Sequence, residues 1–270
     1  MKVFVVGLGL IGASIASGLT KAGHIVYGTD LVSNDIALEK KYILGHDIKK
    51  LSESDVVILC LYPKDNVTFV KKHQDLFRKQ QIIMDVSGTK VEMIAALEKE
   101  IPLGVYYVST HPMAGKEKKG IEYSSSDLFI GANFIICETN KSTTESIETV
   151  TLLAKDLGFK KITQIDKYAH DRLIGFTSQL PHALAVSLVN SDIYSDTSSF
   201  TGDSYRDLTR IAMINENLWQ ELFFENKAVL IEEIKRFEQE LDKIKMALMS
   251  EDKETLTELF IASTKKRSKF

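Results

Sequence analysis

The sequence has little cysteine, no long hydrophobic run and no excess of one charge. Its two cysteines, Cys60 and Cys137, are isolated among 270 residues, which excludes a disulfide framework, gives no metal-ligand spacing and fits a reducing compartment. The apolar start at residues 3–10 is too short to span a membrane and lacks the cleavage site of a secretion signal. The near-balance of 34 Lys and Arg against 37 Asp and Glu argues against a nucleic-acid partner. We therefore expect a cytoplasmic protein without a membrane or nucleic-acid partner.

Length and composition place the chain among ordinary globular proteins. Hydrophobic residues make up 44% and charged residues 26% of the sequence, which disfavours disordered and collagenous classes. A chain of this length favours about two domains and can bury a sizeable core.

The first 165 residues alternate short apolar runs with helical stretches. Several runs are rich in Val and Ile without polar alternation, which is typical of strands buried on both faces. We expect strands at residues 2–6, 25–29, 56–61, 82–86, 106–109, 133–137 and 161–165, and helices at 11–22, 64–77, 91–99 and 144–157. This alternation predicts an α/β domain of Rossmann type with a mostly parallel sheet.

The pattern changes after residue 165, where strand-like runs give way to helical spacing. An apolar stripe predicts one long amphipathic helix over 218–248, and a further helix is expected at 253–263. The segment 191–204, rich in Ser, Thr, Asp and Gly, predicts a loop, and the basic tail at 265–270 is expected to fray. We therefore divide the chain into an α/β domain, 1–165, and an all-helical domain, 166–270.

A glycine motif directly follows the first predicted strand. Gly7 permits a tight turn, Gly9 lets the backbone approach a pyrophosphate, and Gly12 lets helix and strand pack closely. Asp30 ends the next strand, where a carboxylate can bind both ribose hydroxyls of the adenosine and repel a 2′-phosphate. The alternative is a glycine turn without a cofactor, but strand, glycines, helix and acid all coincide. The residues expected at NAD here are Gly7, Gly9, Leu10, Ile11, Gly12 and Asp30.

Further candidates follow other predicted strand ends. Pro63 comes after the strand at 56–61, at the sheet edge where loops line the cofactor crevice, although a simple strand stop explains it equally well. His111 follows the strand at 106–109 and suits proton transfer near neutral pH. A structural histidine that caps a turn is the alternative for His111.

The helical half contributes polar candidates of its own. His182 lies on a predicted helix after Pro181, where a packed or surface histidine is the plainer interpretation. Arg210 belongs to a loop-to-helix junction in which an arginine can bind a carboxylate with two hydrogen bonds, and the alternative is a capping network around Asp207 or Thr209.

Taken together, these motifs resemble prephenate dehydrogenases and their arogenate-using relatives, in the right order over essentially the whole chain. The resemblance rests on the glycine motif, on His-Pro-Met-Ala-Gly at 111–115 followed by Glu117 and Gly120, on Leu-Pro-His at 180–182, and on residues 206–212 with Trp219. It implies oxidative decarboxylation of prephenate with a nicotinamide cofactor, and a homodimer made through the helical domain.

The resemblance also assigns roles to residues. It makes His111 the catalytic histidine at the substrate's ring hydroxyl, Arg210 the residue that binds a substrate carboxylate, and His182 a substrate-binding residue. The remaining residues that it puts near the substrate are Lys116, Glu117, Asp207 and Trp219.

Two positions depart from the family pattern. The segment Asp85-Val86-Ser87-Gly88-Thr89-Lys90 has Gly88 where the family usually carries a serine that assists the catalytic histidine. Ser87, Thr89 or a water molecule is a candidate replacement, and we include Ser87 among the cofactor-binding residues. Lys116 stands where a small hydroxyl residue is common, so it is either an extra cation for a dianionic substrate or a solvated side chain.

The sequence thus predicts an NAD-dependent conversion of prephenate to 4-hydroxyphenylpyruvate in tyrosine biosynthesis. The first alternative is an arogenate dehydrogenase that makes tyrosine directly. A hydroxy-acid or imine dehydrogenase with the same two-domain plan is less favoured, since such enzymes commonly use a catalytic lysine in the helical half. The last alternative is a sensor that binds NAD without turnover.

Overall fold

A single sheet organises the first half of the chain. The computed structural model describes residues 1–115 and 118–269, and within them seven strands form a sheet in the order β2-β1-β3-β4-β5-β6-β7. The strands are β1 (Lys2–Val6), β2 (Ile25–Thr29), β3 (Val56–Leu59), β4 (Ile82–Asp85), β5 (Tyr106–Met113), β6 (Asn133–Cys137) and β7 (Lys161–Gln164). Neighbouring strands pair in parallel, except that β5 and β6 run antiparallel. The predicted mostly parallel sheet is confirmed.

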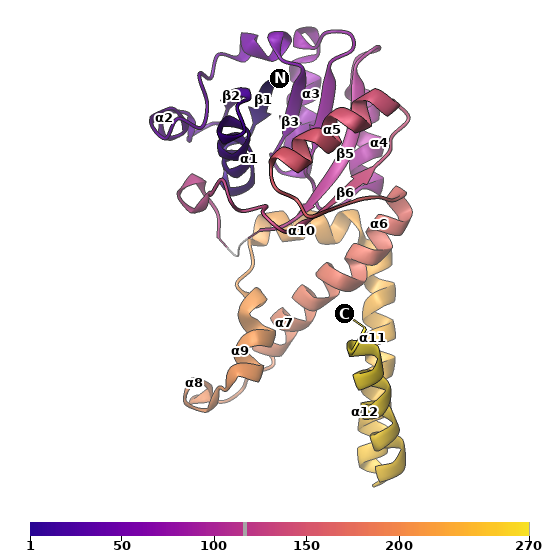
Figure 1. Cartoon of the computed structure of the whole chain (residues 1–270). Coiled ribbons are helices and arrows are strands. Elements are labelled where there is room, and N and C mark those ends of the chain that lie inside the picture. Colours follow the sequence, from indigo (N-terminus) through magenta and orange to yellow (C-terminus); the bar gives the residue numbers. More distant parts are fainter. Residues whose placement is uncertain (116–117, 270) are drawn as a thin grey trace.

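Helices cover both faces of the sheet (Figure 1). The helices of this half are α1 (Leu10–Lys21), α2 (Asn34–Glu39), α3 (Pro63–Lys72), α4 (Val91–Glu100) and α5 (Thr144–Asp156). Apolar residues of α1 and α5 pack with one face of the strands, and those of α3 and α4 pack with the other. The fully buried runs in β1, β3 and β4 follow from this double cover.

The strand order reverses at β1, which lies between β2 and β3. In open α/β sheets a ligand crevice forms at such a reversal, outside the carboxyl ends of the strands. The loops after β1, β2, β3 and β4 all open on this edge. The fold therefore predicts where a dinucleotide binds.

Strand β5 is longer than the predicted strand at 106–109. It continues to Met113 because the added residues pair with β6, with His111 opposite Ile135 and Pro112 opposite Phe134. Sequence periodicity cannot anticipate pairing with a strand that lies far along the chain. His111 therefore lies inside a strand, and a rigid sheet holds its backbone instead of a loop.

The second half of the chain is helical, as predicted. Its helices are α6 (Lys167–Ile174), α7 (Leu180–Asn190), α8 (Thr197–Phe200), α9 (Asp203–Thr209), α10 (Glu216–Glu225), α11 (Lys227–Met249) and α12 (Lys253–Arg267). A π-helical turn, Gly175–Gln179, joins α6 to α7, and a 3-10 turn, Arg210–Ala212, follows α9. Figure 1 shows two arms that extend away from the sheet, one formed by α7, α8 and α9 and the other by α11 and α12.

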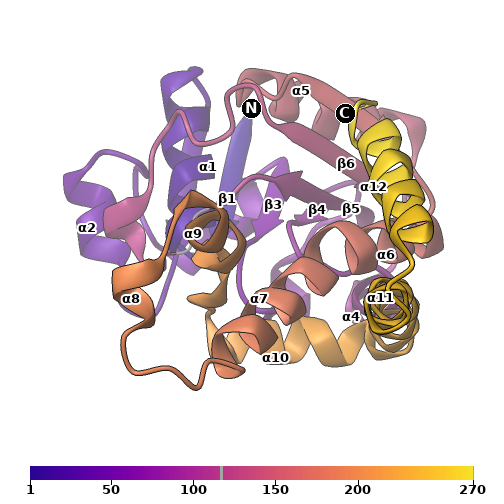
Figure 2. The same ribbon diagram turned by 90° about the horizontal axis from the view of Figure 1, so that it is seen from below.

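The predicted single helix over 218–248 is wrong, because the chain breaks at Asn226 between α10 and α11. The buried Asn226 amide donates to the backbone oxygen of Asp171 and to Gln179 Oε1, at 2.9 and 2.8 Å. These tertiary hydrogen bonds hold the junction while the apolar stripe continues through it. The two helices consequently point in different directions (Figures 1 and 2).

Two smaller expectations also fail. The predicted loop at 191–204 contains the short helix α8. The predicted frayed tail is helical as far as Arg267, because α12 is capped at its start by Asp252 and carries Lys265, Lys266 and Arg267 in its last turn. Cations there are attracted to the negative end of the helix dipole and stabilise the last turn. No helix in the described part of the chain is long and apolar enough to cross a membrane.

Candidate active site

The glycine turn after β1 forms a cradle that side chains would fill. Gly7 has φ +90°, in the left-handed region that favours glycine. A Cβ atom on Gly12 would lie 1.8 Å from the backbone oxygen of Gly7, so a larger residue cannot fit there. A Cβ atom on Gly9 would meet open space, so the backbone can approach a ligand at this point.

The N-terminus of α1 opens on the same space. Its first turn carries Leu10, Ile11 and Gly12, and the first intrahelical donor is Ala13 N, which bonds Gly9 O at 2.9 Å. Among the described residues no side chain caps this helix and its first turn holds no acid. Exposed N–H groups at the positive end of a helix dipole suit a pyrophosphate, so these residues fit the dinucleotide that the sequence predicts.

Asp30 lies at the end of β2 and is partly buried. Its Oδ2 accepts the N–H of Leu8 in the glycine turn at 2.8 Å, and its Oδ1 accepts the N–H groups of Val32 and Ser33 at 2.9 and 3.1 Å. A carboxylate offers about four acceptor positions. In this conformation Asp30 has room for about one ribose hydroxyl, whereas the sequence analysis expects two.

The loops after β3 and β4 complete this side of the crevice. Pro63 begins α3 and is buried, and Ser87 follows β4. The buried Asn66 joins the two loops, since its Nδ2 donates to Leu61 O at 3.1 Å and lies 3.5 Å from Ser87 Oγ. Both predicted residues therefore stand at the carboxyl edge of the sheet.

His111 stands at the same edge, partly buried in β5. Its Nδ1 lies 3.0 Å from Nε2 of His170 on α6, and Nδ1 of His170 lies 2.7 Å from Oδ1 of Asp171. Burial, together with His170 and Lys90, lowers the pKa of His111 well below its usual value. His111 is therefore a neutral imidazole near pH 7 and can accept a proton.

The position of the missing serine lies between His111 and Leu222. A Cβ atom on Gly88 would lie 3.9 Å from His111 Nε2 and 3.3 Å from Cδ2 of Leu222. The two neighbouring hydroxyls are engaged elsewhere, because Ser87 contacts Asn66 and Thr89 Oγ1 donates to the carboxylate of Glu225. His111 is instead supported by His170, on the opposite side of its ring.

A buried ion pair that no sequence motif signals lies beneath this site. Lys90 Nζ donates to Asp85 Oδ2 at 2.7 Å, to Ser109 Oγ at 3.0 Å and to the backbone oxygen of Thr110 at 2.6 Å. Both charged side chains are fully buried. A buried lysine needs such a partner, and its bond to Thr110 fixes the backbone immediately before His111.

The helical half brings a second histidine to an aromatic stack. His182 on α7 lies against Trp219 on α10, with ring centroids 3.7 Å apart and an interplanar angle of 29°. His182 Nδ1 donates to the backbone oxygen of Ser178 at 2.8 Å. Phe223 meets Trp219 edge-on. The predicted residues His182 and Trp219 are therefore in contact, and both are partly exposed.

Asp207 lies near the end of α9, and Arg210 begins the 3-10 turn that follows. This turn packs on α7. Both are exposed, while Arg206 pairs with Asp203 at 2.8 Å. Of the capping alternative, Asp207 falls in the second half of α9, while Thr209 does stand at the start of the 3-10 turn but donates its hydroxyl to the backbone oxygen of Tyr205 and caps nothing with its side chain. Lys116 and Glu117 lie outside the described residues.

Helix α10 holds the helical half against the carboxyl edge of the sheet (Figure 1). Asn215 donates to the hydroxyl of Tyr62 at 2.8 Å, and Glu221 accepts the N–H of Lys64 at 3.4 Å. Further along the helix, Leu222 faces Gly88 and Glu225 accepts from Thr89. One helix thus contacts the loops after β3 and β4 while its Trp219 carries the stack with His182.

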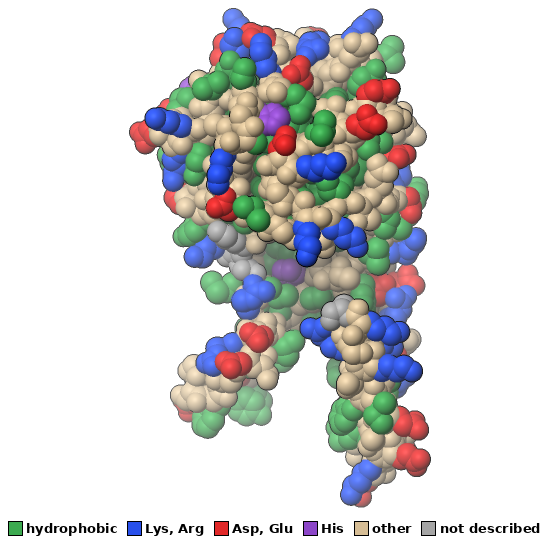
Figure 3. Space-filling model, in the orientation of Figure 1, with side chains coloured by type: hydrophobic (Ala, Val, Ile, Leu, Met, Phe, Trp, Pro, Cys, Tyr) green, Lys and Arg blue, Asp and Glu red, His purple; other side chains and the backbone are tan. Residues whose placement is uncertain are grey.

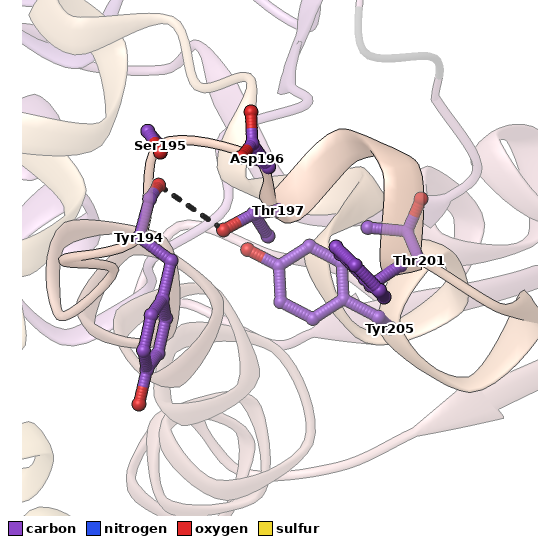
Figure 4. Close-up of a pocket in the computed structure, with 7 residues that line it drawn as sticks. Tyr194, Ser195, Asp196, Thr197, Thr201 and Tyr205 are labelled. Carbon is purple, nitrogen blue, oxygen red and sulfur yellow. Dashed lines mark hydrogen bonds between the residues drawn. The ribbon is translucent and has the colours of Figure 1, made fainter.

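A separate pocket of about 450 Å³ lies around α8 on the first arm (Figure 4). Tyr194, Phe200 and Tyr205 contribute its aromatic lining, and Thr197 Oγ1 donates to the backbone oxygen of Tyr194 at 3.3 Å. None of the predicted site residues that the structure describes lines this pocket. The candidate active site is therefore the edge that carries the glycine turn and His111.

A parallel sheet with this glycine turn, joined to a helical domain that supports a histidine at the same edge, is typical of a two-domain nucleotide-dependent dehydrogenase. Two family models match the chain: the nucleotide-binding domain of prephenate dehydrogenase over residues 15–163, and the dimerization domain of prephenate dehydrogenase over residues 166–262. The chain belongs to the prephenate dehydrogenase family and is an oxidoreductase.

Known proteins are similar to this one over nearly its full length. Prephenate dehydrogenase of Lactococcus lactis subsp. cremoris is 28% identical over 271 residues, covering 96% of this chain and 74% of that protein. Cyclohexadienyl dehydrogenase of Zymomonas mobilis subsp. mobilis is 27% identical over 283 residues, covering 98% and 94%. The crystal structure of prephenate dehydrogenase from A. aeolicus in complex with hydroxyphenyl propionate and NAD+ is similar with a TM-score of 0.91 and 29% identity, covering 100% of this chain and 98% of that one.

Proposed function

We propose that the chain catalyses the NAD-dependent oxidative decarboxylation of prephenate to 4-hydroxyphenylpyruvate, a step of tyrosine biosynthesis. The observation that carries this proposal is the position of His111. A neutral imidazole stands at the sheet edge that also holds the glycine turn, and its Nε2 lies beside Gly88, which brings no side chain against it. A proton acceptor beside a dinucleotide site is what oxidation of a ring alcohol requires.

Eight residues are proposed to hold the cofactor: Gly7, Gly9, Leu10, Ile11, Gly12, Asp30, Pro63 and Ser87. The N–H groups of the first turn of α1 bind the pyrophosphate, and Asp30 accepts a ribose hydroxyl. The carboxylate of Asp30 also disfavours a 2′-phosphate, so NAD is preferred over NADP. When bound, NAD supplies the acceptor for the hydride that leaves the hydroxyl-bearing ring carbon.

His111 manages the proton in this reaction. Its Nε2 accepts the proton of the ring hydroxyl as that carbon loses hydride and becomes a carbonyl. Loss of carbon dioxide then makes the ring aromatic, and the electron pair of the broken C–C bond moves through the ring to the oxygen. The imidazolium returns its proton to this phenolate oxygen, which leaves His111 neutral for the next turnover.

The helical half is proposed to bind the rest of the substrate. Arg210 binds a carboxylate, because a planar guanidinium offers two parallel N–H donors. His182, stacked on Trp219, contributes a further polar contact, and Asp207 lies three residues before Arg210. Lys116 and Glu117 stay in the proposal on the resemblance alone.

We further propose that residues 1–165 and 166–270 are separate domains of a cytoplasmic homodimer, with the helical domain as the interface. The limits of the two family models, 15–163 and 166–262, support this division, and the second model is that of a dimerization domain. Hydrophobic side chains are exposed along both arms (Figure 3), as expected of surfaces that a partner covers.

The test is a comparison of substrates by the absorbance of the reduced cofactor. Prephenate and arogenate are each offered with NAD and with NADP, and simple 2-hydroxy acids serve as controls. We expect the highest kcat/KM with prephenate and NAD. A preference for arogenate would reassign the substrate, activity with the hydroxy acids would favour another dehydrogenase class, and NAD binding without reduction would favour a sensor.

A further inference from the structure

Three side chains form a hydrogen-bonded series that ends at His111. Asp171 and His170 are neighbours on α6, and their side chains are bonded at 2.7 Å. His170 Nε2 then contacts His111 Nδ1 at 3.0 Å, across the junction of the two halves. His170 and Asp171 are only 1% and 2% exposed, so water does not compete for these hydrogen bonds. In a buried hydrogen-bonded series of this kind, each hydrogen bond has a definite donor and acceptor.

Asp171 determines which atoms of this hydrogen-bonded series donate and which accept. Its Oδ1 accepts the backbone N–H of Lys90 and its Oδ2 accepts the backbone N–H of Val91, both at 2.9 Å. These N–H groups belong to the start of α4, where a carboxylate also complements the helix dipole. A backbone N–H group can only donate, and an ionised carboxylate can only accept. Asp171 is therefore an acceptor, and the hydrogen between it and His170 belongs to His170 Nδ1.

The tautomer of each ring follows in turn. A neutral imidazole carries one N–H, so His170 with its hydrogen on Nδ1 has a bare Nε2 that can only accept. The hydrogen between the two rings must then belong to His111 Nδ1. The other nitrogen of His111, Nε2, is left without a hydrogen, and it is the nitrogen that lies 3.9 Å from the position of a Gly88 Cβ.

Burial keeps both rings neutral, and the surrounding charges modify its effect. Burial lowers the pKa of His170, partly opposed by its hydrogen bond to Asp171, and burial with His170 and Lys90 lowers the pKa of His111. The charged groups that act on these rings are Lys90 and Asp85 from the sheet side and Asp171 from α6, and Glu225 of α10 in turn interacts with Asp171. Lys90 and Asp85 are paired with each other, so their opposite charges largely offset one another at the rings.

We infer that His170 is a positioning residue which, held by Asp171, locks His111 in the tautomer whose bare Nε2 accepts the substrate's proton. The inference rests on the proposed function for the identity of that proton. It also accounts for Gly88, because a ring held from its Nδ1 side needs no hydroxyl beside Nε2. During the reaction the O–H bond of the substrate breaks and an Nε2–H bond forms, while the Nδ1–H of His111 remains directed at His170.

The direct test reads the tautomer in the wild-type protein. The chain has 6 histidines, so nitrogen-15 labelling of histidine and two-dimensional spectra that correlate ring nitrogens with ring protons can separate them, with His111→Asn to assign the signal. At pH 7.5 we expect His111 as the Nδ1–H form. A His111 with its hydrogen on Nε2, or an equal mixture of the two forms, overturns the inference whether or not prephenate is the substrate.

The kinetic test uses two substitutions at His170 and a matched control. His170→Phe removes the acceptor, and we expect kcat with prephenate to fall by roughly 10²-fold or more while NAD affinity stays within about twofold. His170→Gln keeps a side-chain oxygen that can accept the Nδ1–H of His111, so it should restore a large part of kcat. The control is His24→Gln, since His24 is also bonded to an aspartate, Asp156, at 2.9 Å but lies far from the site.

The results separate this inference from the proposed function. Wild-type kcat in His170→Phe, or equal loss in His170→Phe and His170→Gln, contradicts the positioning role even if prephenate is oxidised. If prephenate is not oxidised by the wild-type protein, the proposed function fails. The spectra alone then decide whether His170 holds His111 in the Nδ1–H form.

Discussion

Asp30 serves two purposes at the end of β2. It ties the glycine turn to the next loop through the N–H groups of Leu8 and Val32, and it presents the remaining part of its carboxylate to the crevice. Its charge and its hydrogen bonds can therefore be separated experimentally, because asparagine keeps one oxygen while losing the charge.

For Asp30→Asn we expect the preference for NAD over NADP to narrow, since the repulsion of a 2′-phosphate is removed. Asp30→Ser should also narrow the preference for NAD over NADP. It should in addition weaken the binding of both cofactors, because the hydrogen bond to the N–H of Leu8 is lost. The measurement is kcat/KM for each cofactor at saturating prephenate. A wild-type protein that uses both cofactors equally would show that Asp30 does not contact the ribose.

Arg210 and Arg206 form a matched pair of arginines one helical turn apart. If Arg210 binds a substrate carboxylate, Arg210→Gln should raise KM for prephenate by roughly 10²-fold or more, because about 1.4 kcal/mol corresponds to tenfold. Arg206→Gln breaks an exposed pair with Asp203, and such pairs contribute little, so its KM should hardly change. A large fall in melting temperature with unchanged KM in Arg210→Gln would make Arg210 a structural residue.

Residues whose chemistry is local could be predicted from the sequence. The glycine turn and Asp30 lie within one strand-helix-strand unit, so their spacing is sufficient. The bond between His111 and His170 joins residues 59 positions apart, and no periodicity signals it. Lys90 and Asp85 are close in sequence, but their burial depends on strands that pair later in the chain.

At the scale of elements, α10 connects the two halves of the molecule. Its start contacts the loop after β3, and its end contacts Gly88 and Thr89 after β4. The sequence predicts helix throughout this region but misses the break at Asn226, because the apolar stripe passes through it without interruption. The signal for the break is a buried amide, whose partners are visible only in the folded chain.

Asn226→Ala tests this junction. It leaves the backbone oxygen of Asp171 and the side-chain oxygen of Gln179 without their buried donor, which costs about 1–3 kcal/mol per unsatisfied group. We expect the melting temperature to fall by several degrees. Gln220→Ala, on the exposed face of α10, should leave the melting temperature almost unchanged, and equal effects of the two substitutions would contradict the account of the break.

At the scale of the whole molecule, the sheet half is covered on both faces and the helical half is not. Large hydrophobic side chains are exposed on both arms, including Ile193 and Phe200 on the first and Leu241 and Phe260 on the second. Two thin arms cannot bury these faces within one chain, since so few layers are available to cover them. A second copy of the chain is the partner that the proposed homodimer supplies.

Light scattering at micromolar concentration should give the mass of two chains. Leu241→Glu places a charge on the exposed face of α11 and should shift the equilibrium toward single chains. Leu103→Glu is the matched control, because Leu103 is also exposed but lies on the sheet half. A wild-type protein with the mass of one chain, or dissociation caused equally by both variants, would contradict an interface on the arms.

The central claim is that His111 is the proton acceptor in the oxidation of prephenate, and one comparison tests it most directly. Initial rates of cofactor reduction and carbon dioxide release are measured at pH 7.5 for the wild-type protein and for His111→Asn, with NAD affinity as the control for folding. We predict one carbon dioxide per reduced cofactor in the wild type, a kcat lower by roughly 10²–10⁴-fold in the variant, and nearly equal NAD affinity. A variant that keeps the wild-type kcat would contradict the account.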